Sequence, residues 1–555
     1  MKEKMKPMLL DTLKGYSGKQ FVKDLVAGII VAIIALPLSI ALALASGVGP
    51  EQGIYTAIVA GFVISALGGS HVNIAGPTAA FATIVAGIVA RDGMDGLIVS
   101  TVLAGIILVV MGLFRFGGLI RFIPFTITTG FTAGIAVTIV IGQLKDFFGV
   151  TYPEGMPTIE TVEKVEAFAA GISTFNVDAL IVGAACLAIL IIMPKITDKI
   201  PGSLVAVIAG ILMVKFLPLQ VNTIGDLYEI SSKLPSLNIP SVNFEMIRNA
   251  LPNAFTIAIL AAIESLLSCV VADGMVGEKH RSNTELVAQG AGNIASALFG
   301  GIPATGAIAR TAANVKNGGR TPVAGMIHAV VLLLILLVLM PYAGWIPMPT
   351  IAAILFMVAY NMCQWRTFVH LIKTAPKSDI LVLVLTFVLT VVFDLVVAIE
   401  IGMLLACLLF IKRMSGETGV KSWHYTGEKN LEEAERARLR EISDCIRVYE
   451  VTGPLFFGVA DVVNRIVVKK MTRILIIRMR SVNSLDITAM NALTALCEKC
   501  KKENITLILS HVNEQPMHVM EKAGFVELAG AENFCENIDA AIERAEMLAK
   551  QLEQN

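Results

Sequence analysis

The sequence predicts an all-α polytopic membrane domain followed by a small α/β domain. Composition is the first reason, because 55% of the 555 residues are hydrophobic and 16% are charged, whereas soluble domains carry about 25% charged residues. Charge distribution is the second, since charged residues become frequent only after Lys412-Arg413. The third is a pair of short hydrophobic segments that Gly and Pro interrupt. The formal net charge is zero, so neither part is expected to bind nucleic acid.

Apolar runs along the chain predict the individual helices. A membrane-spanning helix needs about 20 predominantly apolar residues. Runs of this type cover, with approximate borders, residues 24–45, 53–68, 97–114, 119–143, 178–194, 202–217, 252–273, 285–299, 322–341, 346–361, 377–394 and 395–412. The interrupted segments at 77–90 and 306–317 bring the number to fourteen. An even number returns the chain to the side on which it started, so the transmembrane domain is expected to span residues 24–413.

Loop charges predict the orientation, because cytoplasmic loops collect Lys and Arg. The loops that this count places inside contain Arg115, Arg121, Lys195, Lys199, Lys279, Arg281, Lys373, Lys377, Lys412 and Arg413. The segment 150–177, which it places outside, is acidic. We therefore expect a multi-pass protein of the cytoplasmic (inner) membrane with both termini cytoplasmic. Residues 1–23 are basic and show no signal-peptide pattern. Seven segments in each half would make the halves inverted repeats.

The two interrupted segments predict a binding site. Gly76, Pro77 and Thr78 open the first segment, and Arg310 lies near the start of the second. An arginine at bilayer depth costs about 2.5–3.5 kcal/mol on insertion scales, so it normally faces a partner or a wet cavity. A helix that starts inside the membrane directs free N–H groups and its positive dipole end at the gap, which attracts an anion. The alternative is a pair of ordinary loops between short helices.

Glu264 and Ser268 are the next candidates, because they share one face of an apolar helix. A buried carboxylate can bind a coupling Na⁺ or take up a proton, and intramembrane acids usually mark ion pathways. The alternative is an ion pair that only joins helices. Ser39, beside Pro37, could present a hydroxyl to the same cavity. His71 and His328 are isolated histidines, a type that is more often structural than liganding.

Alternating strands and helices predict the second domain over residues 441–555, after a charged linker at 414–440. Strands are expected at 446–460, 474–480 and 504–512, and helices at 484–502, 518–525 and 536–554. Cys497 and Cys500 form a C-x-x-C sequence without a second pair that would complete a zinc site. We expect two unpaired thiols on a helix.

Four motifs in order carry a resemblance to a known family: PLSIALALASGVGPEQGIYTAIVAGFVISALGGS, GPTAAFATI, AAIESLLSCVVADGM and ARTAANVKNGGRTPVAG. They resemble the SulP (sulfate permease) family of anion transporters, and the tail resembles a STAS domain. Within the family the chain is similar over its whole length to a bacterial C4-dicarboxylic acid transporter. The resemblance implies a seven-plus-seven inverted repeat that is divided into a core and a gate, with elevator-like movement of the core.

The resemblance also implies the roles of particular residues. The anion would lie between the N-terminal ends of two half-helices, at Gly76, Pro77, Thr78, Ala79, Ile308, Ala309 and Arg310. Glu264 and Ser268 match the ion-coupling positions. Glutamate at this place agrees better with proton than with sodium coupling. In the STAS domain, Asp486 and Thr488 match a regulatory loop with a phosphorylatable hydroxyl, although Asp486 would equally serve as a helix N-cap.

Three functions remain open from the sequence. A secondary active transporter of sulfate, a C4-dicarboxylate such as succinate or fumarate, or bicarbonate is favoured. A uracil-type nucleobase symporter would share the fold, and a channel or membrane-anchored signalling protein is the third possibility. No catalytic residue, metal or cofactor is expected beyond the coupling H⁺ or Na⁺. Expected partners are the anion, membrane lipid, a second copy of the chain and a cytoplasmic protein at the STAS domain.

Overall fold

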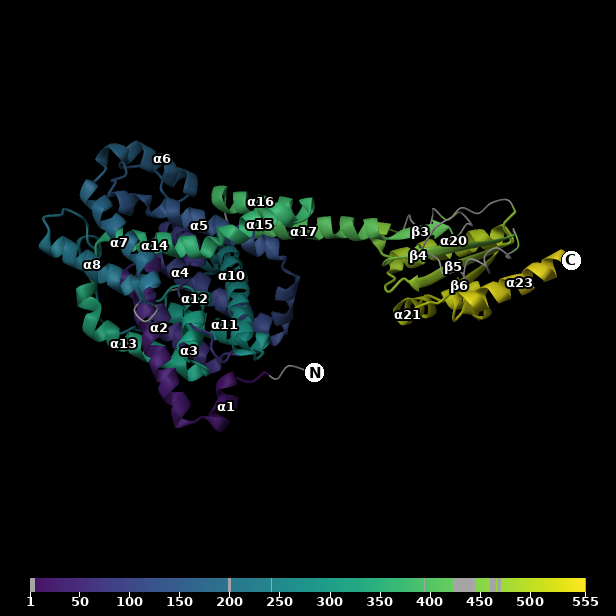
Figure 1. Ribbon diagram of the computed structural model, residues 1–555, viewed down its shortest axis with the longest axis horizontal. Coiled ribbons are helices and arrows are strands. Elements are labelled where there is room, and N and C mark those ends of the chain that lie inside the picture. Colours follow the sequence, from purple (N-terminus) through teal and green to yellow (C-terminus); the bar gives the residue numbers. More distant parts are fainter. Residues whose placement is uncertain are drawn as a thin grey trace. The chain divides into compact units, whose positions relative to one another are not determined.

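The computed structural model divides the chain into two compact units, Met1–Met403 and Leu404–Asn555 (Figure 1). It describes residues 5–197, 201–240, 242–393, 395–422, 445–459 and 471–554, together with Ser443 and Ile466. The helices up to the boundary are α1 (Met8–Thr12), α2 (Gly18–Ala45), α3 (Pro50–Leu67), α4 (Ala82–Leu113), α5 (Phe125–Phe148), α6 (Thr161–Gly171), α7 (Val177–Ile196), α8 (Gly202–Phe216), α9 (Ile224–Leu227), α10 (Phe244–Val276), α11 (Ser282–Leu298), α12 (Ile308–Lys316), α13 (Pro322–Ala343), α14 (Met348–Cys363), α15 (Trp365–Thr374), α16 (Lys377–Val392) and α17 (Leu395–Glu417).

The predicted apolar segments all coincide with helices or with parts of helices in the described residues. Most of two of them, 77–90 and 97–114, lies in the two helical parts of α4, which non-helical backbone at Gly93 (φ 70°, ψ −172°) separates. Eight helical stretches are long and apolar enough to cross a membrane within the part of the chain that is described. Shorter or more polar helices form the other segments, so this unit is a polytopic membrane domain.

The membrane helices pack in two groups. In the first, which we call the core group, α10 and α11 pack on α4, α11 and α13 pack on α3, α13 packs on α2, and α12 contacts α10 and α2. In the second, the gate group, α14 and α16 pack on α5, and α7 packs on α8 and α14. Helix α2 also contacts α8 and α14, so it borders both groups. The division corresponds to the predicted core and gate.

Two very short strands join the halves of the core group. Strand β1 (Ala75–Gly76) pairs antiparallel with β2 (Thr305–Gly306), with Ala75 opposite Gly306. Each strand directly precedes a short helix of its own half. The pairing satisfies backbone groups that would otherwise be unpaired at membrane depth, which is the condition for irregular backbone there. It also brings the two interrupted segments together.

The second unit contains a five-stranded sheet in the order β3-β4-β5-β6-β7. Its strands are β3 (Gly419–Ser422), β4 (Ile446–Thr452), β5 (Ile474–Ser481), β6 (Thr506–Ser510) and β7 (Phe534–Cys535). Strand β3 is antiparallel to β4, and the other pairs are parallel. β3 falls in residues 414–440, where the sequence suggested only a linker; residues 423–440 lie outside the described part.

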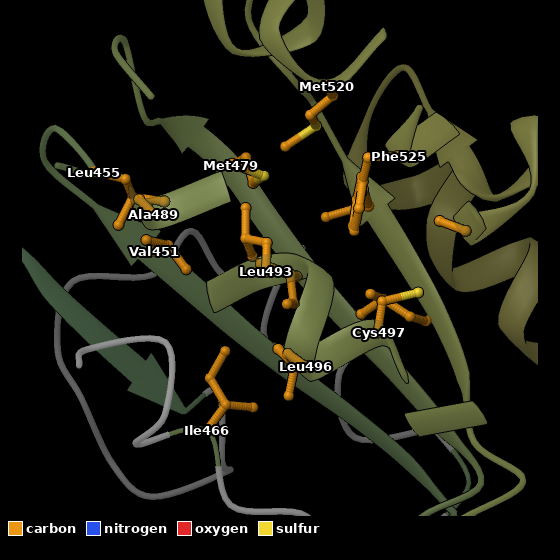
Figure 2. Packing of buried hydrophobic residues seen from close by; sticks show 14 of the residues in the cluster. Val451, Leu455, Ile466, Met479, Ala489, Leu493, Leu496, Cys497, Met520 and Phe525 are labelled. Carbon is orange, nitrogen blue, oxygen red and sulfur yellow. The ribbon is translucent and has the colours of Figure 1, made fainter. Parts of the chain in front are cut away.

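Helices cover both faces of this sheet. These are α20 (Ile487–Lys502), α21 (Glu514–Lys522), α22 (Phe525–Ala529) and α23 (Ile538–Gln554). Successive strand residues point to opposite faces, so Leu475 packs with α20 whereas Ile476 packs with α23. Figure 2 shows Leu493 and Cys497 of α20 in the hydrophobic cluster that also contains Leu475. Cys497 and Cys500 are each 1% exposed, and both are unpaired thiols of this core.

Candidate functional site

Two helix N-termini lie beside the β1–β2 pair. After β1, Pro77 and Thr78 lead into a 3-10 turn (Ala79–Phe81) that continues as α4. After β2, Ala307 caps α12, which begins at Ile308. The free N–H groups of a helix start form a positive end that favours anions. The two helix starts come from different halves of the chain. The pairing of β1 with β2 brings their positive ends to one place.

The accessible side of this place is formed by α12 and Thr78. Ile308 is 42% exposed, Ala309 is exposed, and Thr78 is partly exposed. The other predicted substrate residues, Gly76, Pro77 and Ala79, are buried. An anion reaching the pair of helix ends would therefore meet Thr78 and the first turn of α12, while the remaining residues shape the backbone behind them.

Arg310 lies behind this surface and is 2% exposed. Its Nη2 donates hydrogen bonds to the carbonyl oxygen of Pro77 at 3.2 Å and to Oγ of Ser39 at 3.4 Å. Its Nη1 is buried and has no hydrogen-bond partner in the described part of the chain. A Cβ atom on Gly76 would collide with Nη1, so glycine leaves the space that the guanidinium fills. Arg310 is thus a fixed positive charge behind both helix ends, and it does not project into the accessible space.

The side chain of Glu264, on α10, also reaches this site. It is partly exposed, and its Oε2 accepts a hydrogen bond from Oγ1 of Thr78 at 2.9 Å. The bond links α10 to the start of the α4 half-helix. A carboxylate that is partly accessible and adjacent to a positive helix end can exchange protons or cations with the same space that an anion enters.

Ser268, one turn after Glu264, has different partners. Its hydroxyl donates to Oδ1 of Asn73 at 2.8 Å and lies 3.3 Å from Oγ1 of Thr311. Thr311 in turn donates to Asn73 at 3.1 Å and accepts from the N–H of Ile74 at 3.0 Å. The Ser268 oxygen therefore belongs to a polar cluster that ties α10 and α12 to the segment before β1, whereas the Glu264 carboxylate faces Thr78.

A buried acid that the sequence reading passed over completes this cluster. Glu285 of α11 is 1% exposed and accepts hydrogen bonds from Gly69 N at 2.9 Å and from Asn73 Nδ2 at 2.8 Å. The sequence feature that could have identified Glu285 is its charge at the start of the apolar run 285–299. Asn73 carries no charge and had no such signal. In the ranges described, no three His, Cys, Asp or Glu side chains gather as a metal site would require.

In the second unit, the structure supports a capping role for Asp486. Its carboxylate accepts hydrogen bonds from Ala489 N and Phe457 N, both at 2.8 Å. It therefore caps α20 and also holds the segment after β4. Thr488 lies in the first turn of α20 and is exposed, so a modifying enzyme could reach its hydroxyl.

Comparison with known families gives two matches. Residues 21–386 match the model of the sulfate permease family, and residues 436–541 match the STAS domain. The first match covers most of the membrane helices, including both half-helices.

Individual proteins agree with these matches. The chain is 39% identical over 538 residues to "Putative sulfate transporter YvdB" of Bacillus subtilis, covering 95% of this chain and 98% of that protein. It is 31% identical over 456 residues to the bicarbonate transporter BicA of Picosynechococcus, covering 80% of each. The structure of the murine anion transporter Slc26a9 in its inward-facing state has a TM-score of 0.88 at 18% identity, with 98% of this chain and 94% of that chain covered. At that identity the similarity concerns the fold.

Proposed function

The chain belongs to the sulfate permease family, and on this premise we propose that it is a secondary active transporter of a small anion across the cytoplasmic membrane. The single observation that carries the proposal is the buried Arg310 behind two converging helix N-termini. Fixed positive charge and free N–H groups in a site of low dielectric favour negative ligands. A neutral nucleobase could accept hydrogen bonds from these N–H groups, but it carries no net charge for the guanidinium to attract.

Sulfate or a C4-dicarboxylate is our first choice of substrate. One relative is described as a putative sulfate transporter, whereas a C4-dicarboxylate is retained from the sequence expectation alone. Bicarbonate is the second candidate, because a relative of 31% identity is a bicarbonate transporter. All these anions can be held by helix N-termini and one arginine, so the choice among them rests on the relatives.

We assign the coupling role to Glu264, with a proton as the coupling ion. The carboxylate already accepts a hydrogen bond from Thr78, so protonation would change the contact between α10 and the α4 half-helix. A sodium site would require further oxygen ligands, but the hydroxyl of Ser268, the other predicted coupling residue, is engaged with Asn73. The core group would then carry the anion and the proton together past the gate group. Separately, we expect the protein to form a dimer and the STAS domain to bind a cytoplasmic protein.

Uptake into proteoliposomes tests this function. Purified protein should accumulate radiolabelled sulfate or succinate when an inward proton gradient is imposed, and unlabelled sulfate, succinate, fumarate and bicarbonate should compete according to their affinity. A sodium gradient alone should not drive uptake. Flux that neither saturates nor responds to either gradient would indicate a channel and refute the proposal.

The variant Glu264→Gln separates coupling from binding. It should exchange labelled for unlabelled anion as wild type does and should lose accumulation against a gradient. The matched control is Glu154→Gln, which removes an exposed acid from a loop. Concentrative uptake by Glu264→Gln equal to that of wild type would show that Glu264 does not couple transport.

A further inference from the structure

His328 of α13 is a buried titratable group to which the proposed transport cycle gives no role. The residue has 0% exposure, and neither ring nitrogen has a hydrogen-bond partner in the part of the chain that is described. Burying a polar ring without partners destabilises a protein unless water or another group satisfies it. Its position in the core group therefore calls for an explanation.

Neighbouring atoms place His328 next to Arg310. A methyl group built on Gly61 of α3 would lie 3.8 Å from Nδ1 of His328 and 3.3 Å from the carbonyl oxygen of Ala75. Ala57 lies one turn before Gly61 on α3. A Cβ atom built on Gly76 would be close both to the Cα of Ala57 and to Nη1 of Arg310. Successive turns of α3 thus flank first the guanidinium and then the imidazole.

The next turn of α3 continues the row. Ser65 is buried, and its Oγ has no partner among the described residues. This hydroxyl fills the space beside Gly325, one turn before His328 on α13, where a Cβ atom would collide with it. Unpaired polar atoms of Arg310, His328 and Ser65 therefore follow one face of α3 toward its cytoplasmic end. Buried water normally satisfies such groups, and a proton path along the row requires water between them.

Charged groups on the helices around α13 are few. Helix α3 contributes no charge at Ala57, Gly61 or Ser65. On α2, Asp24 is engaged by Thr321 at the start of α13, at 2.6 Å, and by Tyr16. On α1, which also contacts α13, Asp11 is bound to Arg281 and Lys6. Lys19 and Lys23 of α2 and Glu51 of α3 lie near the first residues of their helices. Within the row itself Arg310 is the charged group, and its charge adds to the cost that burial imposes on a protonated His328.

We propose that His328 takes up a proton when an anion binds in front of Arg310 and releases it toward the cytoplasm along Ser65 when the anion leaves. One ring nitrogen accepts the proton from water and forms an imidazolium, and the same proton returns to water. Without the anion, the guanidinium repels the imidazolium; the anion compensates this repulsion, since like and unlike charges act strongly at low dielectric. Intramembrane histidines serve as proton relays elsewhere. The inference rests on the proposed anion transport and adds a second proton site to Glu264.

Proton counting on the purified full-length protein tests this role. Sulfate, with succinate as second probe, is added in weakly buffered solution that contains a pH indicator, and bound label is measured separately. Wild type should take up protons as it binds the anion. His328→Gln should take up one proton fewer per anion bound and should bind the anion more weakly, because the coupling between the proton and the anion is reciprocal. Glu264→Gln should retain the proton that His328 contributes. An unchanged proton number in His328→Gln, or no uptake by wild type that binds the anion, would overturn the proposal.

A second variant covers the case in which His328→Gln does not fold. Ser65→Ala should bind the anion with the wild-type proton number but should slow proton-driven uptake. Ser100→Ala is its control, because Ser100 of α4 is also a buried hydroxyl without a partner among the described residues. Equal uptake rates in both variants would refute the path. Failure of wild type to bind either probe would instead refute the proposed function, and the label measurement distinguishes these outcomes.

Discussion

Gly76 is the residue at which the site tolerates least change. Its Cα lies where any side chain would meet Nη1 of Arg310. We expect Gly76→Ala to displace the guanidinium and to abolish anion uptake, because overpacking in a tight interior costs about 1–3 kcal/mol. Uptake and thermal unfolding of the purified variant would measure both effects. Gly87→Ala is the control, since a Cβ atom there meets nothing within 4 Å; equal loss of uptake in both variants would contradict this explanation.

At the scale of residues, charge decided what the sequence could predict. Arg310 and Glu264 were identifiable because a charge within an apolar run demands a partner. The capping alternative for Asp486 was also available from the sequence and is confirmed by its bond to Ala489 N. Asn73 was not identifiable, because an uncharged amide carries no comparable penalty and its partners lie on three distant segments. For the same reason the sequence could not show that Ser268 and Glu264 have different partners, since the hydroxyl of Ser268 binds Asn73.

At the scale of elements, α20 depends on its N-cap. Asp486→Ala removes the acceptor for Ala489 N and Phe457 N, and loss of an N-cap costs about 0.5–2 kcal/mol. We expect faster amide hydrogen exchange in the first turn of α20 and in the segment after β4, with exchange in α23 unchanged. Asp486→Asn should keep most of the protection. Unchanged exchange in Asp486→Ala would show that the cap does not stabilise α20.

Long apolar elements were predictable, but their connections were not. Twelve of the fourteen ranges emerged from hydropathy, and the other two from their Gly and Pro interruptions, because a helix must satisfy its own backbone in the membrane. The β1–β2 pairing joins residues about 230 positions apart in sequence, and two-residue strands leave no periodic pattern. Strand β3 was assigned to a linker because four residues next to a charged stretch carry no alternation strong enough to indicate a strand.

At the scale of the whole molecule, the site and the STAS domain are separable. The hydrogen bonds of Glu264 and Arg310 in the proposed site join residues of Met1–Met403. Deletion of residues 414–555 should therefore reduce the amount or rate of transport while leaving the KM for the anion unchanged. Uptake corrected for the amount of protein in the membrane would separate these quantities. A large rise in KM on deletion would mean that the tail contributes to the site.

Binding of labelled anion to the purified Arg310→Ala variant tests the central claim most directly, namely that the anion is held by the two helix ends with Arg310 behind them. Removal of a unit charge close behind the anion is worth about 1–4 kcal/mol, so the Kd should rise at least about 5-fold. Lys316→Ala, which removes an exposed cation from the same helix, should bind as wild type does. Wild-type affinity in Arg310→Ala, measured on folded protein, would contradict the claim.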